Sequence, residues 1–200
     1  MTTGHRPAPD KRPPATTPAD VRAWLGGAER QGQLCSIPSV GDFIERHCQD
    51  RYMVTLTDRR KLPSGEFSQD VGRALRRTNE AFFGTHYKRH RRVFLATYAI
   101  QERTLNDGLH AHIIVGVPIG SLDLKPFKPK LTVPEFIVSA WRQGAPAYRR
   151  EQAQDWRPVH QIGGAFGYVE KTFWSAAGIE NLDVVNSTFP AGYAVPALRG

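Results

Sequence analysis

Alternating apolar and polar side chains predict a strand over residues 108–117, with histidines on one of its faces. Successive side chains of a strand point to opposite faces, so His110, His112 and Ile114 share one face. The other face is wholly apolar and carries Leu109, Ala111, Ile113, Val115 and Val117. One face therefore belongs to a hydrophobic core, and the other presents imidazole rings.

Residues 93–102 predict a second strand just upstream. Between the two strands, Asn106, Asp107 and Gly108 are typical of a three-residue hairpin loop in which glycine takes the left-handed conformation. We therefore expect the two strands to form an antiparallel hairpin.

The expected loop length sets the register of this hairpin. If Leu105 pairs with Leu109, counting back places Glu102 opposite His112. Directly opposed side chains of antiparallel strands point the same way. Glu102, His110 and His112 are therefore expected to converge on one face of the sheet.

Two imidazoles and one carboxylate are typical of a catalytic metal centre, because this donor set leaves coordination positions open. A lone His-x-His sequence would favour a chance polar pair at a strand edge, but the carboxylate on the paired strand reverses that preference. His112 is followed by Ile113 and Ile114, not by the Asp-His of binuclear metallohydrolases. The pattern therefore favours a single divalent ion.

A predicted helix near residue 168 carries a tyrosine and a lysine roughly opposite an apolar stripe. The stripe consists of Phe166, Val169 and Phe173. Lys171, one turn from Tyr168, places a cation beside the phenol, as a phosphate-handling site requires. The alternatives are a tyrosine half-buried in the core and a lysine that is only a solvated surface charge.

Positive charge is concentrated in one stretch of the chain. The formal charge is +8, and residues 59–92 hold ten Lys and Arg against three Asp and Glu, or +7. This stretch predicts a footprint for nucleic-acid phosphates with strongly salt-dependent binding; the alternative is a solvated surface. The candidate phosphate contacts are Arg73, Arg76, Arg77, Lys88, Arg89, Arg91 and Arg92.

Periodicity predicts further elements around these motifs. One helix is expected to begin with Ser68 as its cap and to end near Gly84, with Val71, Leu75 and Phe82 inward. Another is expected after Thr132, with Pro134 in its first turn. One or two short helices are expected between residues 20 and 50, and residues 156–162 predict an edge strand because of Pro158.

A further strand is predicted where Thr55 and Thr57 alternate with Val54 and Leu56. The threonines are expected on the open sheet face with the metal centre, as candidates for phosphate or base contacts. Ordinary β-propensity of threonine explains them equally well. Tyr98, on the Glu102 face of its strand, is a candidate for stacking a base, but packing in the core is the favoured expectation.

Two hundred residues suit one domain with tails. Residues 1–18, rich in Pro and Thr, are expected to be disordered, residues 19–175 to form the domain, and residues 176–200 to pack back irregularly. Cys35 and Cys48 lack CxxC spacing, and no signal peptide or membrane-length apolar run is present. A soluble, cytoplasmic protein is therefore expected.

Three motifs, in this order, resemble those of the HUH endonuclease superfamily and especially its single-tyrosine rolling-circle replication initiators. YMVTLT (residues 52–57) resembles the first-strand motif, Glu102 with GLHAHIIVG (residues 108–116) the histidine motif, and YVEK (residues 168–171) the Tyr-x-x-Lys motif. Together they span about 120 residues. Ala111 departs from the bulky apolar residue that the family prefers between the histidines, which affects packing more than chemistry.

The resemblance implies an α+β fold in which helices flank a central antiparallel sheet of about five strands. It implies a site-specific single-stranded DNA endonuclease and ligase, in which Tyr168, assisted by Lys171, forms a 5′-phosphotyrosine and releases a 3′-hydroxyl that primes synthesis. The implied cofactor is Mg²⁺ or Mn²⁺, held by Glu102, His110 and His112. The implied partner is single-stranded DNA or a stem-loop origin, in a bacterial plasmid or phage.

Other features limit this interpretation. No GxxxxGK[ST] sequence occurs, so a separate helicase in trans is expected, and the predicted helix holds a single tyrosine. HUH transposases and relaxases share the chemistry and stay alternatives. So do a non-catalytic nucleic-acid-binding module on a similar sheet and a metal-dependent hydrolase that uses activated water. The sequence predicts no oligomeric state.

Overall fold

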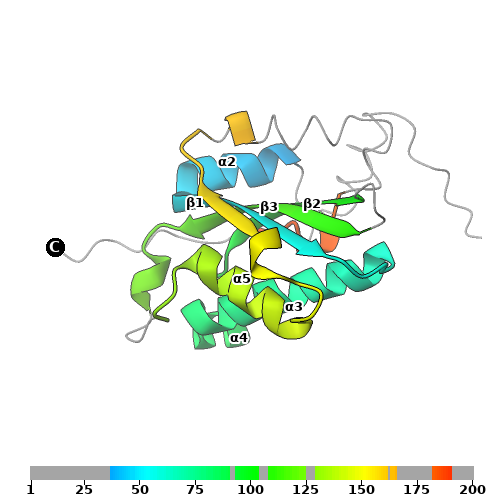
Figure 1. Ribbon diagram of the computed structural model, residues 1–200. Coiled ribbons are helices and arrows are strands. Elements are labelled where there is room, and N and C mark those ends of the chain that lie inside the picture. The colour runs from blue at the N-terminus through cyan, green and yellow to red at the C-terminus, as the bar shows by residue number, and fades with distance from the viewer. Residues whose placement is uncertain are drawn as a thin grey trace, which may run out of the picture.

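The fold is α+β, with helices packed on an antiparallel sheet (Figure 1). The computed structural model describes residues 37–90, 93–103, 108–124, 129–161, 163–165 and 182–190. Within these ranges the sheet has four strands, where the resemblance implied about five. The predicted fold class is therefore confirmed, and the strand number is not.

The strands lie in the order β2-β3-β1-β4, and all neighbouring pairs are antiparallel. Their bounds are β1 Cys48–Asp58, β2 Ala96–Arg103, β3 Leu109–Pro118 and β4 Asp155–Pro158. β4 is an exposed edge strand, as predicted, but it is shorter than the expected residues 156–162. At the opposite edge of the sheet, Leu182 and Thr188 form isolated antiparallel bridges with β2.

Helices lie on both faces of the sheet (Figure 1). α3 (Ser64–Phe83) and α5 (Val133–Gly144) pack on one face, and α2 (Ile37–His47) packs on the other. α4 (Thr85–His90) follows α3. Short 3₁₀ turns occupy Ser121–Leu124, Glu151–Ala153 and Val184–Asn186. In the described part of the chain, no helix is both long and apolar enough to cross a bilayer.

The apolar face of β3 forms the centre of the main core, as its alternation predicted. Each of its inward side chains is at most 2% exposed: Leu109, Ala111, Ile113, Val115 and Val117. They cluster with Phe67 and Val71 of α3 and with Ile137 and Trp141 of α5. Burial of each large apolar side chain in this cluster stabilises the folded state by about 1.5–3 kcal/mol relative to exposure to water.

The histidine-bearing face is only partly covered. Val40, Phe43 and Ile44 of α2 pack against apolar residues of that face, among them Met53 and Tyr98. Tyr98 is 1% exposed, so the expectation that it packs in the core is confirmed. The polar residues at the other end of the face remain partly exposed.

The register of the β2–β3 hairpin differs from the prediction. Arg103 pairs with Leu109, and Glu102 lies opposite His110, whereas Ile100 lies opposite His112. The connection therefore comprises residues 104–108 and is longer than the three residues expected. Because side chains alternate with a period of two, this shift of two residues leaves every side chain on the face that was predicted for it.

The loop residues on which the predicted register relied, Asn106 and Asp107, lie outside the described residues. The correction therefore comes from the paired strand residues on either side of the loop.

α3 begins earlier than predicted, at Ser64 and not with Ser68 as its cap. Phe67 lies one turn before Val71 and is fully buried, so the apolar stripe extends upstream of the predicted start. Pro63 precedes the first turn in an extended conformation. Ser68 therefore lies inside the helix.

The end of α3 and the start of α5 agree with the sequence prediction. Gly84 caps α3 with a φ of 53°, a value that glycine adopts without a steric penalty. At α5, the carboxylate of Glu135 accepts hydrogen bonds from the backbone N–H and the hydroxyl of Thr132, at 2.8 and 2.7 Å. Pro134 lies in the first turn.

A buried ion network, which sequence patterns did not predict, joins β1, α3 and the segment between α5 and β4. Arg149 is 2% exposed; its Nε donates to Asp58 at 2.7 Å, and it also pairs with Asp70. Its guanidinium lies 3.6 Å from the ring centroid of Trp141. Burial alone would raise the pKa of Asp58, but hydrogen bonds from Arg60 and Arg149 outweigh it and lower that pKa.

We expect Arg149→Met to destabilise the fold by about 3 kcal/mol, because it removes one of the two cations that neutralise the buried carboxylate of Asp58. Urea denaturation followed by circular dichroism measures this loss. Arg142→Met is the matched control, since the side chains of the Arg142–Glu151 ion pair are 39% and 71% exposed and such a pair contributes under about 1 kcal/mol. Equal free energies of unfolding for the two variants would contradict the role assigned to the network.

Candidate metal centre

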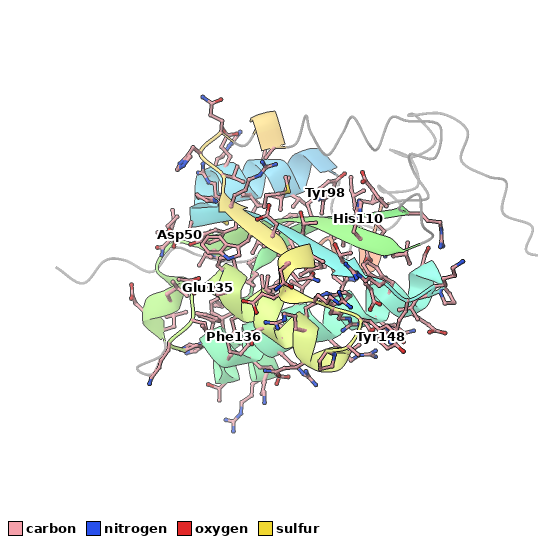
Figure 2. The ribbon with its side chains drawn as sticks, viewed as in Figure 1. Asp50, Tyr98, His110, Glu135, Phe136 and Tyr148 are labelled. Atoms are coloured by element: carbon pink, nitrogen blue, oxygen red, sulfur yellow. The ribbon has the colours of Figure 1, made fainter. Side chains whose placement is uncertain are left out.

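Glu102, His110 and His112 converge at the hairpin end of β2 and β3. One ligand atom from each lies within 4.8 Å of the others, so the three could hold a metal ion. Figure 2 shows His110 on the side of the sheet that α2 covers, with Tyr98 on the same side. The structure therefore brings together the three ligands expected from the sequence.

Strand geometry explains this convergence. Glu102 is directly opposite His110, and their Oε2 and Nε2 atoms are 2.7 Å apart. His112 follows two residues later on the same face, with its Nε2 3.5 Å from the same oxygen. The three side chains are 13–23% exposed, so ligands from solvent can approach them.

The electrostatic surroundings favour the neutral form of His112. Burial lowers its pKa most, and the neighbouring His110 lowers it further, whereas Glu102 acts in the opposite direction. Arg157 adds a smaller lowering effect on this pKa. Since only an unprotonated imidazole nitrogen binds a metal, the ring is ready to act as a ligand at neutral pH.

Both threonines of β1 lie beside the histidines, as the alternation predicted. Thr55 is directly opposite His112 and Thr57 directly opposite His110. Oγ1 of Thr55 lies 3.1 Å from Nδ1 of His112, within hydrogen-bond distance. The hydroxyl of Thr55, a candidate for contacts with DNA, is therefore engaged by a ring of the candidate centre.

Arg157 on β4 is a residue that sequence reasoning missed. It pairs with Met53, which shares its sheet face with Thr55, so Arg157 belongs to the face of the metal centre. Arg157 is exposed, and its charge influences the pKa of His112. The sequence of β4 does not show which of its faces lies with the histidines, because only the pairing of β4 with β1 decides this.

The arginines of α3 lie on the other side of the sheet. Arg73, Arg76 and Arg77 are exposed, as predicted, but α3 packs on the face opposite the metal centre (Figure 1). Arg73 is also ion-paired with Asp70. The structure therefore does not bring these arginines to the metal centre.

The rest of the basic cluster follows α3. Lys88 and Arg89 are exposed on α4, and Lys88 Nζ lies 3.4 Å from a carboxylate oxygen of Glu80. Arg91 and Arg92 lie outside the described residues.

The tyrosine motif also falls outside the part of the chain that the structure describes, so Tyr168 and Lys171 have no assigned positions. The described residues on either side are Ala165 and Leu182, and both pack against the apolar cluster of α2 and the metal-site face of the sheet.

Comparison of the sequence with protein-family models gave no match. Searches among curated proteins and among solved structures also gave no match. The resemblance to the HUH superfamily therefore rests on the motif residues themselves.

We expect His112 of the metal-free protein to titrate below the ordinary histidine value of about 6.5, because its charged form is disfavoured by burial and by His110. The pH dependence of its ring Cε1–H NMR signal measures this pKa, with His112→Asn used to assign the signal. A midpoint at or above the ordinary value would contradict the environment described for this ring.

Proposed function

We propose that this chain is a metal-dependent endonuclease that nicks single-stranded DNA and transfers the strand through a 5′-phosphotyrosine, as HUH replication initiators do. The observation that carries the proposal is the meeting of Glu102, His110 and His112 on a partly exposed sheet face. In this role the protein initiates rolling-circle replication, with single-stranded DNA or a stem-loop origin as its substrate.

The donor set fits a divalent ion such as Mg²⁺ or Mn²⁺. Glu102, His110 and His112 would hold it through one carboxylate and two imidazoles, which leave the complex a net positive charge. When bound, such an ion supplies Lewis-acid stabilisation of the charge that develops on a phosphate. Three protein ligands would also leave the ion accessible to substrate.

Tyr168 is the proposed nucleophile. Its phenol gives up its proton to solvent, and the oxygen forms a bond to phosphorus as the bond from phosphorus to the 3′-oxygen breaks. The leaving oxygen takes up a proton and becomes a 3′-hydroxyl. The 5′-phosphate stays on the tyrosine, so the energy of the phosphodiester is kept for rejoining.

Lys171 has a defined part in this step. A free phenol has a pKa near 10, so only roughly one in a thousand is ionised at neutral pH. A cation one helical turn away stabilises the phenolate and increases that fraction. The spacing of Tyr168 and Lys171 in the sequence suits this interaction.

The sequence position of Tyr168 supports this choice of nucleophile. Ala165 packs against the apolar cluster that α2 forms with the metal-site face of the sheet. Tyr168 follows it by three residues in the sequence.

Two groups of cations serve different stretches of DNA in this proposal. Arg157 is an exposed cation on the face of the metal centre, where it can contact phosphates close to the reacting one. The arginines of α3 lie behind the sheet and suit phosphates farther along the substrate, such as those of a stem.

We expect the protein to bind Mn²⁺, and His110→Ala or His112→Ala to weaken that binding by about 10–100-fold or more, because each removes a donor atom. Isothermal titration calorimetry measures the affinity, and nicking of circular single-stranded DNA should fall in parallel. His86→Ala, which removes an exposed histidine of α4, is the control that should bind as the wild type does. Full nicking activity in excess chelator would discard the metal role.

We expect Tyr168→Phe to abolish a covalent protein–DNA adduct on denaturing gels while leaving binding of single-stranded DNA largely intact, because the variant loses only the hydroxyl. Tyr148→Phe is the matched control, since Tyr148 is 50% exposed and lies before β4. Persistence of the adduct in Tyr168→Phe would identify another nucleophile. Cleavage by the wild type with no attached protein would indicate a hydrolase that uses activated water.

A further inference from the structure

We propose that Thr55 is a positioning residue of the metal centre, whose hydroxyl accepts a hydrogen bond from Nδ1–H of His112 and thereby directs Nε2 of that ring toward the metal. This inference rests on the proposed metal centre and adds a residue from a third strand to it. It also gives the threonine of the first-strand motif a role distinct from contact with DNA.

The two nitrogens of the His112 ring face different strands. Nδ1 lies 3.1 Å from Oγ1 of Thr55 on β1, and Nε2 lies 3.5 Å from Oε2 of Glu102 on β2. Thr55 and His112 are directly opposite in the register of β1 and β3. One nitrogen is therefore held on the side of β1, and the other points into the cluster of metal donors.

The chemistry of a metal-bound imidazole requires an acceptor at this position. A neutral ring that offers the lone pair of Nε2 to a metal carries its proton on Nδ1. An N–H in a largely buried side chain needs a partner, and His112 is 13% exposed. The hydroxyl oxygen of Thr55 is that partner, so the hydrogen bond selects the tautomer and the ring orientation that a metal requires.

The threonine side chain suits this task. β-branching restricts its χ1 rotation, and its place in the central strand β1, paired on both sides, fixes its backbone. The acceptor oxygen is therefore held in place before a metal binds. Less side-chain conformational entropy is then lost when the metal binds.

Thr57 provides a comparison within the same strand. It lies directly opposite His110 on the same face, but within the described ranges its hydroxyl makes no hydrogen bond with either ring. Its backbone N–H donates to Oε1 of Gln154 at 2.7 Å. A threonine that serves only β-propensity should tolerate valine, and Thr57 tests that outcome directly.

The experiment compares four proteins: the wild type, Thr55→Val, Thr55→Ser and Thr57→Val. Valine keeps the shape and β-propensity of threonine and removes only the hydroxyl, whereas serine keeps the hydroxyl. We expect Thr55→Val to weaken Mn²⁺ binding by about 10–100-fold, and Thr55→Ser and Thr57→Val to stay within about threefold of the wild type. Titration calorimetry measures affinity, and urea denaturation establishes that all four proteins fold.

A spectroscopic measurement tests the hydrogen bond itself. In the Mg²⁺-loaded wild type, long-range ¹H–¹⁵N correlation spectra should show His112 protonated at Nδ1 and unprotonated at Nε2. Thr55→Val should shift the Nδ1 resonance of His112 and leave the resonances of His86 unchanged. A purely structural loss of packing would not produce this selective change.

The outcomes separate the two proposals. If His112→Ala loses Mn²⁺ binding and Thr55→Val binds as the wild type does, the positioning role is wrong and the metal centre stands. If Thr55→Ser binds as weakly as Thr55→Val, the hydroxyl is not the group that matters, which also overturns the positioning role. If the wild type binds no Mn²⁺, the metal centre itself is wrong.

Discussion

The register between β2 and β3 is the constraint on which the candidate site depends. It sets Glu102 directly opposite His110 and leaves His112 on the same face two residues later. A slip of one residue would turn the donors of one strand into the core, because side chains repeat every two residues. The apolar face of β3 opposes that slip, since it would bury two imidazoles beneath α3 and α5. Hydrophobic burial on one face thus fixes the polar geometry on the other.

The two faces of the sheet are covered to different extents, and this difference explains where a polar centre can exist. α3 and α5 cover one face so fully that even Asp58, at its edge, is completely buried and paired with Arg149. On the other face α2 covers the apolar part, and the three candidate metal ligands beyond it are 13–23% exposed. Partial exposure keeps the carboxylate of Glu102 in contact with water and leaves the three side chains open to ligands.

Exposed arginines lie on both faces of the sheet. Arg73, Arg76 and Arg77 are exposed on α3, and Arg157 lies on the face of the candidate metal centre. A helix with its side chains is about 10 Å across, so the outward side of α3 is well separated from the donors. Within the proposed function, a strand at the metal centre therefore meets a different set of cations from a duplex bound at α3.

Local patterns by themselves determined the strands, the two faces of β3, the end of α3 and the cap of α5, because each depends on residues a few positions apart. The face of Glu102 was predicted although the register was not, since a shift of two residues returns a strand to the same face. Only the tertiary structure decided that Thr55 meets His112 and that Asp58 meets Arg149. The first pair is separated by 57 positions in the sequence and the second pair by 91. No local periodicity encodes such pairs; they follow from which strands and helices the burial of the whole core brings together.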